Sequence, residues 1–281
     1  MDHCAISRRR RITGKLAQAT TMEALPEECL SHVISFTSPR DACRSALVSG
    51  IFRGAADSDI AWEKFLPLDY LEIISRSISP VEYSSKKELF IKLSSAPLLI
   101  DGGNKTFLID KYTNKKCYML SARELSISWS TNSLCWCWKP LAQSRFPEAV
   151  ELIMVCWLEI RGKINTKMLS PNTTYGAYLV FQLAHRAFGL GVLPSKVSVE
   201  VGDYKTQGTL CLNREECKMQ VEEQQRERVL CPRDDGWLEV ELGEFYNGGS
   251  EKEVKMEFRE TKGEQLKGGL VVEGIELRPK Q

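Results

Sequence analysis

Residues 174–183 read TYGAYLVFQL, and this stretch decides the fold. It is a near-continuous apolar run whose centre is Tyr178, Leu179, Val180 and Phe181. Like every apolar run in the chain, it is far shorter than the roughly 18 residues of a membrane-spanning helix, so we expect no membrane protein. Because both alternating sets of side chains are apolar, the run is typical of a β-strand that is buried on both faces.

From about residue 106 the chain alternates between apolar and polar residues. A period of two is typical of strands with one buried and one wet face. In the last alternating segment the phase changes at Gly274, which predicts a β-bulge. Short strands separated by turns predict an antiparallel, jelly-roll-like β-sandwich over residues 106–281. The alternating segments are residues 156–164, 197–201, 238–242, 254–258 and 270–277.

Two segments depart from this pattern. Residues 213–228 hold nine charged residues in sixteen and no Gly or Pro, which predicts either a helix or a mobile, solvated insertion between strands. Residues 67–105 have the pattern of a helical connector, in which Ser85 and Glu88 fit a capping box. The connector is either an arm that sets the distance between two domains or a segment packed onto the second domain, and both interpretations fit the sequence.

Residues 22–66 have the pattern of three or four short helices. Pro26 suits the first position of one helix, where its missing N–H costs nothing. Ser38, Pro39 and Asp41 predict the start of the next, with the serine as N-cap. About 45 residues bury little core alone, so such a unit exposes apolar side chains unless a partner covers them. This part of the chain therefore has the character of an interaction module.

Composition and charge exclude several classes of protein. Of the 281 residues, 43% are hydrophobic and 27% are charged, as in ordinary globular proteins. The formal net charge of +1 leaves no general basic footprint for nucleic acid. The basic excess lies in residues 1–21, which include Arg8–Arg11. We expect a disordered, solvated tail there, although such a run also fits a nuclear signal or a transit peptide.

The ten cysteines do not have the pattern of a disulfide framework. Since no secretory signal is recognisable either, we expect a reducing compartment, the cytoplasm or the nucleus. Cys135 and Cys137 are separated by one residue, whereas paired zinc ligands prefer two to four, and no second pair follows at a fitting distance. The sequence therefore predicts neither a metal site nor a cofactor.

Catalytic candidates are few. The chain has three histidines, and none stands in a nucleophile motif. Glu239, Glu241 and Glu244 could supply a carboxylate pair for glycoside cleavage, but acids at alternate strand positions normally form the wet face.

Trp129, Trp136 and Trp138 lie within ten residues of one another, among small polar residues. Proteins hold sugars with exposed aromatic faces beside polar groups, so this cluster favours carbohydrate binding. The same rings could instead fill the interior of the sandwich, and composition alone does not separate the two interpretations.

The order and spacing of residues 25–62 resemble an F-box. The resemblance is carried by Leu25, Pro26, Glu27, Glu28, Ile34, Pro39, Arg40, Asp41, Val48, Ser49, Phe52 and Trp62. It implies docking onto the Skp-type adaptor of a cullin-RING ubiquitin ligase. The residues expected to form or support the adaptor-binding surface are Leu25, Pro26, Leu30, Ile34, Val48, Phe52 and Trp62.

Residues 106–280 resemble the phloem protein 2 family. The matching stretches are KCYMLSAR (116–123), SRFPE (144–148), VCWLEI (155–160), TYGAYLVF (174–181), DGWLE (235–239) and GIELRPK (274–280). This family resembles the Nictaba-type cytoplasmic lectins, which bind N-acetylglucosamine oligomers and N-glycan cores.

The resemblance to these lectins implies particular sugar-binding residues. Their motif has two tryptophans seven residues apart, which Trp129 and Trp136 match. Glu239 and Glu244 lie in a segment that resembles the acidic segment of the lectins. Cys135 stands where an aromatic residue often precedes the second tryptophan, and this difference predicts weakened sugar binding.

Both resemblances together predict an α+β plant protein, with a small helical F-box (22–66) ahead of an antiparallel β-sandwich. We expect a non-catalytic substrate-recognition subunit of an SCF-type E3 ubiquitin ligase in the cytoplasm and nucleus. It would bind the Skp-type adaptor and cullin complex and a glycoprotein or protein target. One alternative is a lectin for N-acetylglucosamine-containing glycans without a ligase role, and another is a glycoside-processing enzyme. Adaptor co-purification, glycan binding without adaptor, and turnover of a chitin-type oligomer would distinguish the three.

Overall fold

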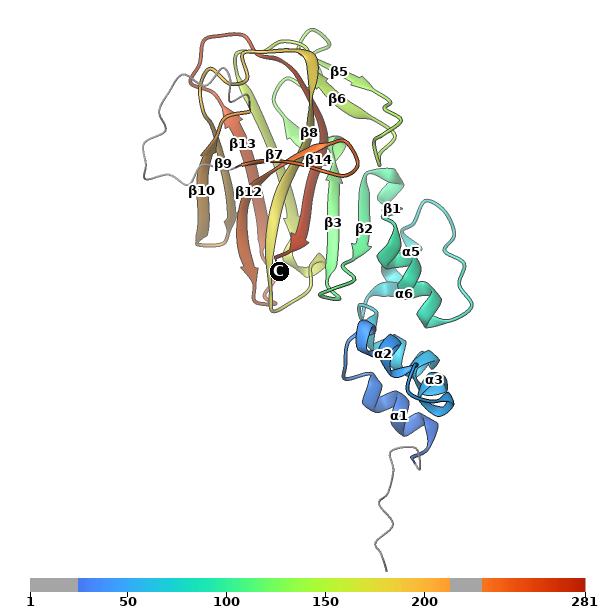
Figure 1. Ribbon diagram of the computed structural model, residues 1–281. Coiled ribbons are helices and arrows are strands. Elements are labelled where there is room, and N and C mark those ends of the chain that lie inside the picture. Colours follow the sequence, from blue (N-terminus) through green and yellow to red (C-terminus); the bar gives the residue numbers. More distant parts are fainter. Residues whose placement is uncertain (1–24, 213–228, 281) are drawn as a thin grey trace, which may run out of the picture.

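The computed structural model describes residues 25–212 and 229–280, in which a helical N-terminal region leads into a large β domain (Figure 1). The expectations for residues 1–21 and 213–228 lie outside the described residues. The helices are α1 (Glu27–Ile34), α2 (Pro39–Ser45), α3 (Gly50–Asp57), α4 (Asp59–Phe65), α5 (Tyr70–Ser75) and α6 (Lys86–Ser95).

Serine side chains cap the starts of several helices. The Ser38 hydroxyl accepts the Asp41 N–H at 3.1 Å, and the Ser85 hydroxyl accepts the Glu88 N–H at 3.2 Å. Both caps were expected, because a cap is a local feature of the sequence. Pro26 is the N-cap of α1, so the helix begins at Glu27, one residue later than expected.

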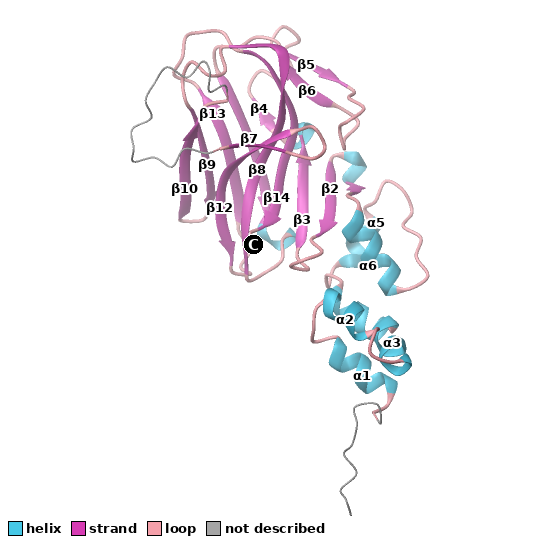
Figure 2. Ribbon diagram, in the orientation of Figure 1, coloured by secondary structure: helices cyan, strands magenta, loops and turns pink. Residues whose placement is uncertain are grey.

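The β domain consists of two antiparallel sheets (Figure 2). The first has the order β1-β2-β3-β14-β8-β12-β11, and β6 joins it through β14 and carries β5. The second has the order β10-β9-β13-β7-β4. The first sheet contains β1 (Leu98–Ile100), β2 (Lys105–Ile109), β3 (Lys116–Ser121), β5 (Trp136–Lys139), β6 (Ala149–Leu152), β8 (Thr173–Phe188), β11 (Leu230–Pro232), β12 (Leu238–Asn247) and β14 (Gly268–Pro279). The second contains β4 (Ser126–Ile127), β7 (Leu158–Asn165), β9 (Ser195–Val201), β10 (Tyr204–Leu210) and β13 (Glu253–Glu260), and short 3₁₀ turns lie at Asp101–Gly103, Ala122–Glu124 and Thr166–Met168.

The strand that decides the fold, β8, is buried on both faces. Leu179 and Phe181 are fully buried and belong to the main core together with residues of the second sheet. Val180, on the opposite face, is also fully buried, in a second apolar cluster with Phe146 and Trp237. Loops that reach over β8 therefore cover the outer face of the first sheet as well.

A β-bulge interrupts β14, where the change of phase predicted one. Val272 pairs with Phe181 and Gly274 with Val180, so Glu273 is the extra residue. A Cβ on Gly274 would lie 2.0 Å from the carbonyl oxygen of Leu120, and this close approach requires glycine.

In the structure the connector ends where β1 begins, at Leu98, and it packs onto both of its neighbours. Arg76, just after α5, donates to both carboxylate oxygens of Asp101, at 2.8 and 2.7 Å. On the other side, the ring of Phe90 in α6 lies 5.3 Å from that of Trp62 in α4. Buried side chains form one continuous apolar core from α1 to β14. The first strand of the sheet begins at Leu98, ahead of the expected domain start at residue 106.

The α+β architecture, with N-terminal helices ahead of a large antiparallel β domain, agrees with the sequence-based expectation. No helix within residues 25–212 and 229–280 is long and apolar enough to cross a membrane. Seven cysteines of the described part are free thiols, whereas Cys211, just after β10, is disulfide-bonded.

Candidate functional site

Exposed apolar side chains gather on the first three helices and the turns between them. Phe36 is 77% exposed, Leu47 81% and Val48 67%, although all three are large hydrophobic residues. α1 packs against α2 and α3, so these side chains belong to one small unit. Several large apolar side chains exposed on one small unit indicate a surface that a partner covers. We call this set the F-box apolar surface; its members are Leu25, Val33, Phe36, Leu47, Val48 and Ile51.

The structure divides the residues expected at the adaptor into two groups. Leu25, Pro26 and Val48 are exposed, and Phe52 is half-buried. The others, Leu30, Ile34 and Trp62, are at most 3% exposed and pack inside the helical unit. These three side chains hold the helices together and present no surface to a partner.

Sequence reasoning missed part of the F-box apolar surface. Val33 and Phe36 are three residues apart at the end of α1, and Leu47 and Ile51 are four apart around the turn into α3. Phe36 and Leu47 lie in the turns that follow α1 and α2, whereas Val33 is in the last turn of α1 and Ile51 in the first turn of α3. The available signal was therefore the number of large apolar residues at and beside the ends of helices that are too short to bury them all.

Trp136 lies in the core, which corrects the expectation that its ring holds a sugar. Its side chain is 2% exposed, and its indole N–H donates to the Ser128 carbonyl at 2.9 Å. Trp138 likewise donates to the Ser130 carbonyl at 3.1 Å, and the Arg123 guanidinium lies 3.6 Å from the centre of its ring. Both indoles hydrogen-bond the preceding loop to β5, so these two side chains stabilise the fold.

Trp129 lies between Ser128 and Ser130, whose carbonyls accept these two hydrogen bonds, and its side chain is exposed to solvent. Its side chain is 59% exposed. Its φ of +67° lies in the left-handed region, which bulky side chains rarely adopt. Backbone strain of this kind persists only where the surroundings impose it. The ring of Trp129 is thus available for stacking, in contrast to that of Trp136.

The two acidic residues expected at the sugar site lie on a strand that is far from β5 in the sheet. Glu239 and Glu244 are on β12, and β6, β14 and β8 lie between β12 and the tryptophan strand β5. At about 4.8 Å per strand, β5 and β12 are roughly 19 Å apart. Trp136 therefore does not form one site with Glu239 and Glu244, because three strands of the sheet separate them.

Glu239 is held in ion pairs. It accepts hydrogen bonds from Arg278 at 2.8 Å and from Arg233 at 2.6 Å. Burial raises the pKa of Glu239, but the hydrogen bonds and charges of the two arginines outweigh burial and lower it overall. Glu244 contacts the Lys280 ammonium at 2.9 Å. Both carboxylates are engaged by the protein's own cations.

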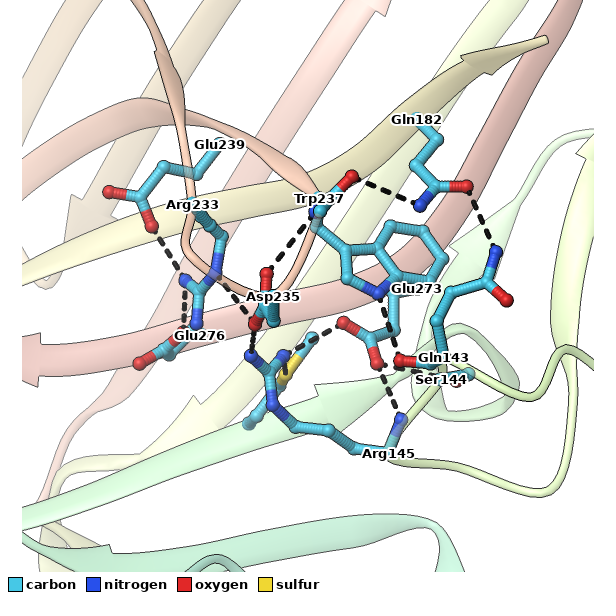
Figure 3. Close-up of polar contacts among 12 residues, drawn as sticks. Gln143, Ser144, Arg145, Gln182, Arg233, Asp235, Trp237, Glu239, Glu273 and Glu276 are labelled. Carbon is cyan, nitrogen blue, oxygen red and sulfur yellow. Dashed lines mark hydrogen bonds and ion pairs between the residues drawn. The ribbon is translucent and has the colours of Figure 1, made fainter.

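A charged network fastens two loops over the outer face of β8 (Figure 3). The Arg145 guanidinium contacts Glu273 at 2.8 Å and also Asp235. The Arg145 backbone N–H donates to the same Glu273 carboxylate at 2.7 Å. The Trp237 indole N–H donates to the Gln143 carbonyl at 3.1 Å. These contacts hold the rings of Phe146 and Trp237 over Val180, and they explain how that face is covered.

The β-bulge places Glu273 in this network. Its side chain is fully buried, and burial raises the pKa of the carboxyl group while the charge of Arg145 opposes the rise. Sequence reasoning assigned no role to Arg145, Asp235 or Glu273. The first two stand in the SRFPE and DGWLE stretches. Those stretches thus contain the residues that close the outer face of the sheet.

Within residues 25–212 and 229–280, no three His, Cys, Asp or Glu side chains are grouped in a way that could hold a metal ion. Cys135 is half-buried and Cys137 is exposed, and both are free thiols.

Two different family models match the two halves of the chain. The family model described as Phloem protein 2 matches residues 115–279, and the F-box-like model matches residues 22–67. Among Arabidopsis thaliana proteins, F-box protein PP2-B15 is 48% identical, over 91% of this chain and 96% of its own length. F-box protein VBF is 44% identical, over 92% of this chain and 100% of its own.

Solved structures overlap only loosely with the chain. A β-(1,4)-mannanase from Podospora anserina is 9% identical, covers 59% of this chain and 28% of its own, and has a TM-score of 0.33. The overlap is too loose to bear on function. The full-length similarity to the Arabidopsis proteins and the two family matches agree with each other. The chain therefore belongs to the phloem protein 2 family, among the members that carry an F-box ahead of the phloem protein 2 domain.

Proposed function

We propose that this protein is the substrate-recognition subunit of an SCF-type ubiquitin ligase. Its F-box binds the Skp-type adaptor, and its β domain binds the target. The observation that carries this proposal is the F-box apolar surface, where Phe36, Leu47 and Val48 are all at least two-thirds exposed. Burying them in an interface releases about 25 cal/mol per Å² of apolar surface, which favours binding of a partner.

The protein itself does no chemistry in this role. It holds the target near the enzyme that carries ubiquitin, so its contribution is proximity and orientation. The contacts at both ends of the connector support such a role. Arg76 donates hydrogen bonds to Asp101 on the side of the β domain, and Phe90 packs on Trp62 on the side of the first helices. An arm that is packed at both ends keeps the target at a fixed position relative to the adaptor.

Adaptor binding can be tested by changing the F-box apolar surface. Leu47→Asp in the full chain puts a charge on the most exposed leucine of α2–α3, and we expect co-purification of the Skp-type adaptor to fall at least tenfold. Hot-spot side chains typically contribute ~2 kcal/mol or more each. Leu25→Ala with Pro26→Ala should weaken binding as well. The measurement is a quantitative pull-down with co-expressed adaptor.

The matched control is Ile91→Asp, at a leucine-sized residue of α6 that is 48% exposed but lies outside the F-box helices. It should leave adaptor binding unchanged, and circular dichroism should show that all variants are folded. Undiminished co-purification of the adaptor with Leu47→Asp and with the Leu25/Pro26 double variant would refute the adaptor role.

Carbohydrate binding is a second candidate function, and the exposed ring of Trp129 favours it. We expect weak binding of N-acetylglucosamine oligomers to the full chain, lost in Trp129→Ala because a stacked ring provides most of a weak sugar affinity. A glycan array with both proteins measures this. A silent array from folded wild-type protein, or equal binding by the variant, would remove Trp129 from any sugar site.

A further inference from the structure

A cleft of about 420 Å³ opens at one end of the second sheet. β9, β10 and β13, which form it, lie on the opposite side of the β domain from the helices (Figure 1). Its walls combine aliphatic and cationic side chains, chiefly Leu193, Pro194, Lys196, Thr209, Arg259 and Lys262. None of these residues belongs to the sites described above.

Two like charges face each other in this cleft. Lys196 on β9 pairs directly with Arg259 on β13, so both side chains stand side by side on the outer face of the sheet. Like charges at directly opposed positions destabilise a sheet. Lys196 has no ion-pair partner among the described residues, and Arg259 reaches only Glu257, at 3.5 Å. A pair of this kind is explained if an anion from outside occupies the space between the two.

An unsatisfied hydroxyl extends the row. Thr209 on β10 is the direct partner of Lys196, so Arg259, Lys196 and Thr209 lie across three neighbouring strands. Thr209 is 8% exposed, and its hydroxyl oxygen has no hydrogen-bond partner. A buried hydroxyl without a partner is unfavourable, and a rotation of the Thr209 side chain toward the cleft would let an oxygen of a bound anion accept its hydrogen bond.

The carboxylates around the cleft are each engaged by another cation. Glu257 contacts Arg161 at 3.0 Å, and Glu159, which stands opposite Arg259 on β7, contacts Arg161 at 2.6 Å. Glu260 is 4% exposed and forms an ion pair with the buried Lys267. Its other oxygen accepts the backbone N–H groups of Lys262 and Gly263, at 3.1 and 2.9 Å. Because Glu260 is already neutralised, it does not offset the charges of Lys196, Arg259 and Lys262 at the mouth of the cleft.

We propose that this cleft is a target-recognition site, which takes an anionic side chain of a polypeptide together with an apolar neighbour. The anion lies over Lys196 and Arg259 and accepts the Thr209 hydroxyl, and the apolar side chain packs on Leu193 and Pro194. A peptide fits better than an acidic sugar, because no aromatic ring lines the cleft. This inference rests on the proposed role as a substrate receptor.

The test compares three peptides of one scaffold, acetyl-Gly-Leu-X-Leu-Gly-amide, where X is glutamate, phosphoserine or serine. Dissociation constants are measured by NMR titration of the full chain. We expect at least tenfold tighter binding of the glutamate or the phosphoserine peptide than of the serine peptide, and this preference should fall with added salt. The two acidic peptides distinguish a carboxylate from a phosphate as the recognised group.

Lys196→Gln with Arg259→Gln should abolish the preference for acidic peptides. The melting temperature should not fall, because the change removes a like-charge pair. The matched control is Lys163→Gln, on the same face of the sheet but paired with Glu253 and outside this cleft. It should leave the preference intact.

Equal binding of all three peptides by wild-type protein, or a preference that survives in the double variant, would overturn the proposal. So would tight binding of an oligogalacturonate, an acidic sugar, that the acidic peptides do not displace. Adaptor co-purification is scored on the same samples. If wild-type protein shows no acidic preference while the adaptor still co-purifies, the cleft alone is refuted. If wild-type protein prefers the acidic peptides but does not co-purify the adaptor, the receptor role is refuted and the cleft is kept.

Discussion

At the scale of single residues, the two lectin-like tryptophans differ in what their removal should do. Trp136→Ala should lower the free energy of unfolding by about 3–5 kcal/mol, because it empties a core site and removes the bond to the Ser128 carbonyl. Trp129→Ala, at an exposed ring, should change stability by less than about 0.5 kcal/mol. Urea unfolding of the two variants measures the difference. Equal stability losses would contradict the placement of Trp136 in the core.

Arg145 should matter for stability in a way that depends on pH. Arg145→Met leaves the Glu273 carboxylate buried without its cation, and we expect a loss of about 3–5 kcal/mol at pH 7. Burial raises the pKa of Glu273, so the protonated carboxyl group stabilises the folded state. This contribution to stability is lost as pH rises through the folded-state pKa. The loss should therefore be smaller near pH 4 than at pH 7.

Urea unfolding of wild type and variant at both pH values measures the pH dependence. Arg44→Met is the control, since Arg44 and Asp41 form an exposed pair with side chains 62% and 52% exposed. Exposed pairs contribute ~0–1 kcal/mol. A loss in Arg145→Met that does not change between pH 4 and pH 7 would show that Glu273 is not the group left unpaired.

At the scale of elements, the bond between the connector and the sheet can be tested through Asp101. The hydrogen bonds from Arg76 lower the pKa of Asp101 in the fold. A lowered pKa gives stability that is complete above the unfolded value of about 3.9 and is lost as pH falls through the folded value. Asp101→Asn should thus cost about 1–2 kcal/mol at pH 7 and progressively less below pH 4.

Asparagine suits this test, because Asp101 has a φ of +54°, a region that Asn tolerates. The measurement is the stability difference between wild type and variant across pH 2–7. A difference that is constant over that range would mean that the charge of Asp101 does not hold the connector.

Elements defined by local patterns could be predicted, and those defined by distant contacts could not. The period of two revealed the strands around β9 and β13, and the change of phase revealed the bulge at Gly274. The Ser38 cap is likewise local. In contrast, Arg145 and Glu273 are 128 residues apart, so no window of sequence relates them. Trp136 was misassigned because its carbonyl partner lies in a loop whose path only the tertiary structure fixes.

At the scale of the whole molecule, the helices and the β domain form a single body. One continuous apolar core runs from Leu30 in α1 to Leu277 in β14. Lys116 of β3 adds an ion pair to Asp69 at the start of α5, at 3.0 Å. The change from a helical pattern to a period of two indicated two domains but left open whether the connector packs onto the second, because the side chains that join them are ordinary apolar residues of short elements.

The shared core restricts how such genes can be shuffled. A crossover at residue 105 would keep Arg76 and its partner Asp101 in the same half. It would, however, separate β1 (Leu98–Ile100) from β2, the strand with which it pairs. A foreign β domain would have to rebuild that pairing and the surface that receives α6. Descendants of this architecture should therefore diversify by point changes on the exposed loops and clefts of the β domain, while the junction between the two halves is inherited as one block.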